Sequence, residues 1–156
     1  MANDTNYATF FQRLIAYIID LILIGFIQTV FIAPLLGLLG IGLALGDDFS
    51  QSEKVTFFSI FAGIGIAVYL VIFILGWLYF ALFESSAKQA TPGKMALGIK
   101  VADTNGERLS FVKATLRYFG KYLSGMFMMI GYIIAGFTER RQALHDFIAG
   151  SIVLQK

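Results

Sequence analysis

The sequence predicts an all-α membrane protein with two long transmembrane helices, a small cytoplasmic β-hairpin, an interfacial amphipathic helix and a third, short apolar segment. Of its 156 residues, 58% are hydrophobic and only 14% are charged, whereas soluble domains carry about 25% charged residues. Two apolar runs, 14–45 and 55–83, exceed the ~20 residues that a helix needs to cross a bilayer. We therefore expect one membrane domain over residues 1–156. Cysteine is absent, which excludes disulfides and thiolate metal sites.

The first span is expected over about residues 12–33. One straight helix over the whole apolar run would be about 48 Å long, well over the ~30 Å hydrocarbon core. Pro34 lies inside this run, and a proline in a helix removes one hydrogen bond and clashes with the preceding turn. We therefore expect a kink or a break at Pro34.

The second span is expected over residues 55–83, which contain no charged side chain. Just before it, Ser50 and Glu53 have the spacing of a capping box, in which the two side chains satisfy free backbone N–H groups at the start of a helix. This spacing predicts that the second long helix begins near Ser50.

The distribution of basic residues predicts the orientation in the membrane. Segment 84–121 holds seven basic residues, whereas the linker 46–54 holds one. Because basic residues gather on the cytoplasmic side, we expect the N-terminus and segment 84–121 to be cytoplasmic in a multi-pass protein of a bacterial-type plasma (inner) membrane. The seven are Lys88, Lys94, Lys100, Arg108, Lys113, Arg117 and Lys121.

Two local patterns predict structure within the cytoplasmic segment. Short apolar stretches at 99–102 and 107–109 flank Asp103-Thr-Asn-Gly106, and Asn-Gly between such stretches is typical of a β-hairpin. Ser110 then follows as the cap of an amphipathic helix, in which Lys113, Arg117 and Lys121 recur at every fourth residue. Such a helix can lie in the interface, so we favour binding of anionic lipid headgroups over a specific protein partner.

The third apolar segment, about 118–137, leaves two topologies open. Its continuous apolar part, 123–137, is only 15 residues long and is below spanning length unless it includes 118–122. Basic residues flank it on both sides, so a simple crossing would oppose the charge rule. We slightly favour a re-entrant path over a crossing. The C-terminal element, 139–156, is expected to contain a short amphipathic stretch over 143–154.

Asp20 is the residue in the first span that most needs an explanation. A carboxylate inside a membrane helix costs about 2.5–3.5 kcal/mol and is usually directed to a partner or a water-filled path. Arg13 lies seven residues earlier on nearly the same helix face, about 10 Å away along the axis. Tyr17 lies between them and could relay a hydrogen bond. Arg13 alone is explained by an interfacial anchor, and Asp20 either by a structural ion pair or by binding of a cation or proton.

Charged residues near the C-terminus provide possible partners. Asp146 could pair with Arg13, and Arg140 or Arg141 could pair with Asp20 if that element packs beside the first helix. His145 next to Asp146 is weak evidence for a metal, since zinc requires three or four ligands, although histidine can also shuttle protons.

No motif in the chain predicts catalysis. Segment 91–95 lacks the spacing of a phosphate-binding loop, and no nucleophile, base and acid occur together. We therefore expect no enzymatic activity, no metal, no cofactor and no nucleic-acid partner.

Several motifs together resemble the RDD family of small membrane proteins, which is named for one arginine and two aspartates. In this chain those residues correspond to Arg13, Asp20 and Asp146. The resemblance implies a function that is mostly unassigned, with cation/proton antiport described for some members, possible oligomers, and related domains in membrane adaptors. The motifs that carry it are 11–20, 89–101, 103–106 and 140–150.

Two functional hypotheses follow. In the first, a homo-oligomeric secondary transporter exchanges a monovalent cation for a proton at Asp20, while Arg13 and Asp146 tune or gate that site. Because two spans enclose no pathway, this hypothesis requires an assembly of copies. In the second, the protein is a non-transporting membrane scaffold or adaptor, and the same three residues form a structural ion-pair lock.

Overall fold

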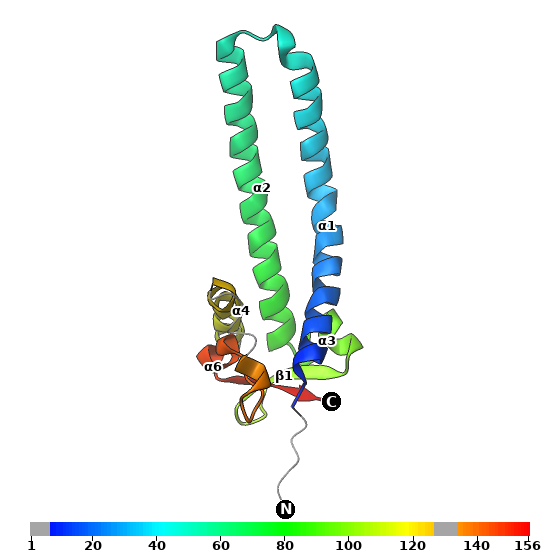
Figure 1. Cartoon of the computed structure of the whole chain (residues 1–156), viewed down its shortest axis with the longest axis vertical. Helices are drawn as coiled ribbons and strands as arrows, with labels where there is room; N and C mark the ends of the chain where they lie inside the picture. The colour runs from blue at the N-terminus through cyan, green and yellow to red at the C-terminus, as the bar shows by residue number, and fades with distance from the viewer. Residues whose placement is uncertain (1–6, 127–133) are drawn as a thin grey trace, which may run out of the picture. The chain divides into compact units, whose positions relative to one another are not determined.

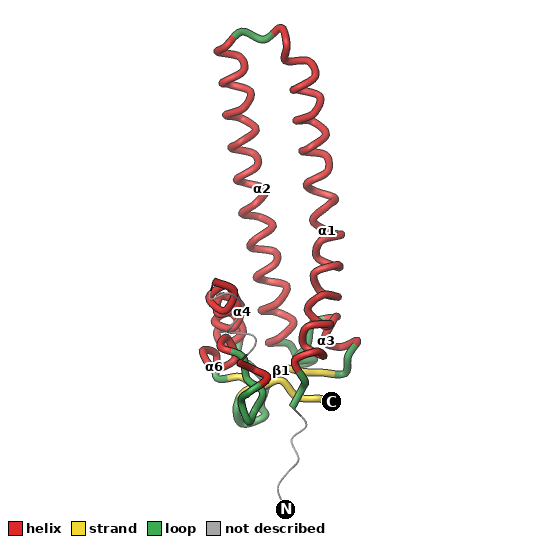
Figure 2. Tube along the Cα trace, viewed as in Figure 1, coloured by secondary structure: helices red, strands yellow, loops and turns green. Residues whose placement is uncertain are grey.

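The structure, a computed structural model, describes residues 7–126 and 134–156 and confirms the predicted fold class. It is mostly helical, with two long apolar helices, a small two-stranded sheet and additional short helices (Figures 1 and 2). The chain divides into two compact units, one made of residues 22–76 and the other of residues 1–21 and 77–156. We describe each unit separately.

The long helices are α1, Phe10–Leu45, and α2, Gln51–Ser85. Helix α1 begins after a capping box in which the Gln12 N–H donates to Thr9 Oγ1 and the Thr9 N–H donates to Gln12 Oε1. It continues through Pro34 without a break, so the expected break was wrong. Prolines are tolerated inside membrane helices because neighbouring groups and small adjustments satisfy the freed carbonyl.

Helix α2 begins where its sequence predicts. The Ser50 N–H donates to Glu53 Oε2 over 2.8 Å, and the Glu53 N–H donates to Ser50 Oγ over 3.4 Å. These two bonds form the expected capping box. The short helix η1, Gly46–Asp48, connects α1 to α2.

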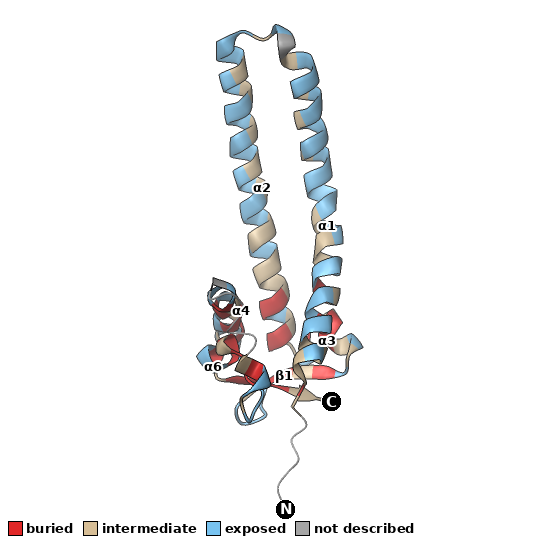
Figure 3. Ribbon diagram, viewed as in Figure 1, coloured by how far each residue is buried: buried red, intermediate tan, exposed pale blue. Residues whose placement is uncertain are grey.

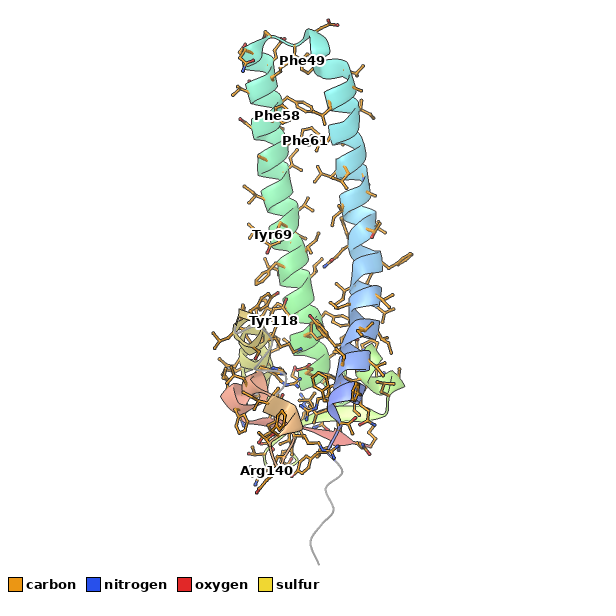
Figure 4. All side chains as sticks on the ribbon, viewed as in Figure 1. Phe49, Phe58, Phe61, Tyr69, Tyr118 and Arg140 are labelled. Atoms are coloured by element: carbon orange, nitrogen blue, oxygen red, sulfur yellow. The ribbon has the colours of Figure 1, made fainter. Side chains whose placement is uncertain are left out.

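The unit of residues 22–76 consists of the distal parts of α1 and α2 and the turn between them. Near the turn, a Cβ atom on Gly42 would lie 1.9 Å from the Phe57 ring, so only glycine permits this contact. Phe57 also packs on Phe61, with ring centroids 4.7 Å apart; Figure 4 labels Phe49, Phe58 and Phe61 in this region.

Apolar side chains of this unit remain uncovered by protein. None of the side chains described between residues 22 and 76 is buried (Figure 3). Both long helices contain stretches apolar and long enough to cross a membrane. An apolar surface of this extent requires a non-aqueous environment, which agrees with the predicted membrane class.

The second unit contains a two-stranded sheet, but one of its strands is not the one that was predicted. Strand β1, Ile99–Asp103, pairs antiparallel with β2, Ser151–Gln155. The predicted tight turn is present, since the Gly106 N–H donates to the Asp103 carbonyl over 3.0 Å. The prediction that 107–109 would be the second strand was wrong, because the partner comes from the C-terminus.

A small apolar core lies between the sheet and the short helices. It includes Ile99, Val101, Leu109 and Val153, each at most 1% exposed. Val101 and Val153 are register partners, so the C-terminal strand contributes to this core as well as to the sheet. Leu109 is buried in the same core although it lies outside the sheet.

The described part of this unit contains further helices besides the two long ones. Helix α3, Pro92–Ala96, precedes β1, while α4, Phe111–Met126, packs against α6, Leu144–Ala149. The helix predicted after Ser110 is confirmed as α4. Gly150, with φ +57°, ends α6 and directs the chain into β2, so the stretch predicted as one amphipathic element is a helix followed by a strand.

The predicted third apolar segment is described only at its two ends. Its first part belongs to α4, and a short helix η2, Ile134–Gly136, follows residues 127–133. The choice between a crossing and a re-entrant path falls on residues 127–133, which lie outside the described residues.

A pair of alanine substitutions tests the assignment of β2 as the core strand. Val153 is fully buried, whereas its neighbour Leu154 is only partly buried. We expect Val153→Ala to lower the free energy of unfolding by about 2 kcal/mol, and Leu154→Ala to lower it less although leucine loses more atoms. Unfolding of the detergent-solubilised protein measures both, and a larger loss for Leu154→Ala would contradict the assignment.

Candidate functional site: three buried carboxylates

Three carboxylates of the second unit, Asp20, Glu84 and Asp146, are fully buried. They come from α1, α2 and α6. An isolated buried charge is very costly, so each requires compensation by hydrogen bonds or opposite charges. The three are compensated in two different ways.

Asp146 is held by two arginines and by the backbone of its own helix. Arg117 donates to Asp146 Oδ1 through Nε at 2.8 Å and Nη2 at 2.7 Å. Arg13 donates through Nη1 to Oδ2 at 2.5 Å, and the Ala143 N–H donates to the same oxygen at 3.1 Å. Burial raises the pKa of Asp146, but the adjacent cations, Arg117 above all, lower it well below its usual range.

Arg117 connects this group to a second one. Its Nη1 lies 2.8 Å from Glu84 Oε2, so one buried guanidinium joins the carboxylates of α6 and α2. Glu84 also pairs with Lys94 from α3 and lies 3.5 Å from Lys121 Nζ. Burial lowers the pKa of Arg117, but Asp146 and Glu84 raise it above that of an exposed arginine. We call these residues, together with Arg13, the ion-pair network.

The basic residues of α4 were predicted to face lipid headgroups, but two of the three contact Glu84 inside the protein. Arg117 is 2% exposed, and Lys121 lies beside Glu84 with its Nζ 4.1 Å from the centre of the Phe80 ring. Lys113 has the most exposed side chain of the three, at 44%, and its Nζ lies 3.7 Å from Asp103 Oδ2. The interpretation of the stripe as a face for lipid headgroups was wrong for Arg117, because the acidic partner Glu84 lies inside the protein.

Asp20 is held by neutral donors instead. Tyr79 Oη donates to Asp20 Oδ1 at 2.8 Å, Thr91 Oγ1 donates to Oδ2 at 2.5 Å, and the Gly93 N–H donates to Oδ1 at 2.8 Å. Within residues 7–126 and 134–156, Asp20 forms no ion pair. The structure therefore brings Arg13 together with Asp146, as considered from the sequence, but it does not place Asp20 in that pair.

The neutral cradle of Asp20 depends on the close packing of α3 on α1. A Cβ atom on Gly93 would lie 2.1 Å from the Ala16 carbonyl oxygen and 2.9 Å from the Asp20 carboxyl. Only glycine allows this approach. Pro92 follows Thr91 at the start of α3, a position where proline is favourable because its missing N–H has no helical partner.

Arginines 140 and 141, predicted as possible partners of Asp20, lie elsewhere. Both are exposed, and Arg141 Nη1 donates to the Tyr7 carbonyl at 3.4 Å (Figure 4 labels Arg140). The pairing of either arginine with Asp20 was wrong, because Tyr79, Thr91 and Gly93 occupy the carboxylate.

The remaining predicted residues, Tyr17 and His145, have other surroundings. Tyr17 packs on Phe80, with ring centroids 6.2 Å apart, and among the described residues it donates no hydrogen bond to Asp20. His145 is 5% exposed, with Nδ1 3.4 Å from Ser124 Oγ and Nε2 3.6 Å from Asp146. Burial lowers the pKa of His145 to about 3, so the ring is neutral at pH 7.

Sequence reasoning assigned Arg117 and Lys121 to a lipid-facing stripe rather than to the site. It also missed Tyr79, Glu84, Thr91, Gly93 and Lys94. Glu84 had a signal, because it ends an apolar run and its nearest available partners are basic residues later in the chain. The Thr-Pro-Gly-Lys stretch lacks the spacing of a phosphate loop, but its compact turn supplies a hydroxyl, a backbone N–H and an ammonium within four residues.

The buried ammonium of Lys94 predicts a pH dependence of stability. Burial lowers the pKa of Lys94, and Arg117 and Lys121 lower it further, to about 7 despite the attraction of Glu84. Between pH 7 and about 10.5 the unfolded chain therefore binds a proton that the folded protein lacks, so the free energy of unfolding rises with pH in this window. We expect a rise of at least ~1 kcal/mol, measured by thermal unfolding in detergent.

The matched variants for this experiment are Lys94→Met and Lys88→Met, since Lys88 is exposed. Lys94→Met should reduce the rise to the contribution of Lys121, whose pKa burial also lowers, whereas Lys88→Met should retain the full rise. An equal rise in both variants would show that Lys94 does not cause the effect.

Comparison with known proteins identifies the family of this chain. The chain is 31% identical over 157 residues to the uncharacterized protein YxaI of Bacillus subtilis (strain 168), covering 96% of this chain and 97% of that protein. It is 27% identical over 152 residues to the uncharacterized membrane protein YteJ of the same organism, covering 96% and 82% of the two chains. No solved structure matches. The RDD family model matches residues 7–150, and the chain is a membrane protein that belongs to the RDD family.

Proposed function

We propose that this protein is a secondary transporter that exchanges a monovalent cation for a proton at Asp20. One observation supports the proposal above all: Asp20 is fully buried, and its charge has no cationic partner among the described residues. Asp146 and Glu84, in contrast, each contact at least two cations. Asp20 is therefore the buried carboxylate whose charge a bound cation or proton would neutralise.

The groups around Asp20 suit both occupants. Carboxylate, hydroxyl and carbonyl oxygens are the ligands that hard cations prefer, and Tyr79 and Thr91 place two hydroxyl oxygens against the carboxylate. The hydroxyl groups can donate to a charged carboxylate and accept from a protonated one. Exchange of a cation for a proton at Asp20 would thus require only reorientation of these hydroxyl groups.

The proposal also includes an orientation of the protein in the membrane and a homo-oligomeric state. The N-terminus and segment 84–121 are cytoplasmic in a bacterial-type plasma membrane, as the distribution of basic residues predicts. The described residues contain two candidate spans, and two helices cannot enclose a pathway, so the transporting form is a homo-oligomer. Arg13 and Asp146 act as a gate in this proposal, because their ion pair fixes the helix that carries Asp20.

The alternative function is a membrane scaffold without transport. The observation that favours it is the Asp146–Arg117–Glu84 connection, which ties α2, α4 and α6 together through buried charges. In this alternative, Asp20 serves only to hold α3 against α1, through Thr91 and Gly93.

Replacement of Asp20 by asparagine distinguishes the two functions. Asparagine keeps the shape of the side chain and removes its charge, so it cannot exchange a cation for a proton. In reconstituted vesicles we expect a cation-dependent proton flux from the wild type and the flux of protein-free vesicles from Asp20→Asn. A pH-sensitive dye inside the vesicles measures the flux, with Na⁺, K⁺ and Li⁺ tested in turn.

Asp48→Asn is the control, because Asp48 is an exposed carboxylate in η1. It should keep the wild-type flux, and gel filtration should show that all three proteins have the same oligomeric state. Absence of flux from the wild type, or equal flux from Asp20→Asn, would contradict transport at Asp20. Loss of assembly in Asp20→Asn without any wild-type flux would favour the scaffold.

A further inference from the structure

Arg13 uses only part of its guanidinium in the ion pair with Asp146. Nη1 donates to Asp146, whereas Nε and Nη2 are buried and have no hydrogen-bond partner among the residues that the structure describes. These two nitrogens form one edge of the planar group, and two parallel N–H donors on such an edge match the spacing of two oxygens of a carboxylate or phosphate. Buried donors without acceptors are rare in folded proteins.

The charges around Arg13 also favour an anion. In the described part of the chain, the ion-pair network contains four cations and two carboxylates, an excess of two positive charges when all are ionised. Above its pKa of about 7 Lys94 is neutral, and the network then keeps an excess of one positive charge. Asp20, which is held by neutral donors, lies outside this count. A buried excess of charge requires a counterion. The cations are Arg13, Lys94, Arg117 and Lys121, and the carboxylates are Glu84 and Asp146.

The side of the network nearest the solvent carries a further cation. Arg13 is 13% exposed and therefore lies at the edge of the network. Arg141 is exposed and lies near enough to Arg13 to interact with it electrostatically. Arg117 contacts Asp146, the carboxylate that also pairs with Arg13. Among the described residues, the Arg141 side chain makes one polar contact, a marginal one from Nη1 to the Tyr7 carbonyl at 3.4 Å, so its guanidinium retains donors for a ligand.

We propose that Arg13, through Nε and Nη2, binds a phosphate group, with Arg141 as the second cationic contact. A phosphate group offers paired oxygens to the free edge of Arg13 and a negative charge that offsets the excess of the network. The phosphate comes either from a phospholipid headgroup or from inorganic phosphate in solution. This site shares Arg13 with the gate of the proposed transport, but it is separate from the cradle of Asp20, and phosphate binding does not require transport.

Two arms of one experiment distinguish the sources. In the first, lipid-free protein in detergent is heated in sodium phosphate and in sodium chloride at matched Na⁺ concentration and ionic strength. A ligand that binds only the folded state raises the unfolding midpoint. In the second arm, native mass spectrometry of gently extracted protein counts retained phospholipid. A phosphate-specific rise in the midpoint identifies the free ion, and retained phospholipid identifies the headgroup.

Arg13→Lys is the principal variant, because lysine keeps the charge beside Asp146 and lacks the paired donors. We expect it to weaken the binding seen in either arm by about tenfold or more. Arg141→Gln removes an exposed side chain and should also weaken binding, and it provides the test if Arg13→Lys fails to fold. Lys88→Gln, an exposed cation outside the network, should leave binding unchanged.

Two results would overturn the proposal. The first is a wild type that responds to phosphate no more than to chloride and retains no phospholipid. The second is binding that Arg13→Lys and Arg141→Gln leave at the wild-type level, which would place any phosphate elsewhere on the protein.

Discussion

The ion pairs of the buried Arg117 guanidinium with Asp146 and Glu84 are the interactions on which the packing of the second unit depends. It donates to Asp146 from α6 and lies against Glu84 from α2, and both carboxylates are fully buried. Removal of one member of such a group leaves an uncompensated buried charge, at a cost of about 3–5 kcal/mol. That is a large part of the ~5–15 kcal/mol by which folded domains are stable. The network therefore constrains which helices can pack together, and Arg13 extends this constraint to α1.

The segment of residues 91–94 contacts two buried carboxylates, Asp20 and Glu84, which differ in whether their partners are neutral or charged. Thr91 and Gly93 hold Asp20 through neutral donors, while the next residue, Lys94, pairs with Glu84 inside the network. Glu84 is thus paired with cations of the protein, whereas Asp20 has only neutral donors as partners among the described residues. In the proposed transport, Glu84 is therefore structural, the Arg13–Asp146 pair is the gate, and Asp20 is the position where exchange is chemically reasonable.

The features predicted correctly from the sequence are those that depend on residues close together in the chain. The Ser50–Glu53 capping box, the turn at Asp103–Gly106 and the helix after Ser110 all follow from local hydrogen bonding. The partner of β1 was missed because it lies at the far end of the chain, and the direction of Arg117 was missed because its acceptor Glu84 belongs to an apolar helix. Periodicity shows which residues of a helix share a face, but not whether that face contacts lipid or protein.

Carboxyl ¹³C resonances of Asp20 and Asp146, observed in lipid bilayers at constant pH, test the separation of roles most directly. The two aspartates are equally buried, so a difference between them must arise from their partners. We expect addition of Na⁺, K⁺ or Li⁺ in place of a large organic cation to move the Asp20 resonance in a saturable manner and to leave the Asp146 resonance unchanged. A saturable shift at Asp146 with none at Asp20 would contradict the account.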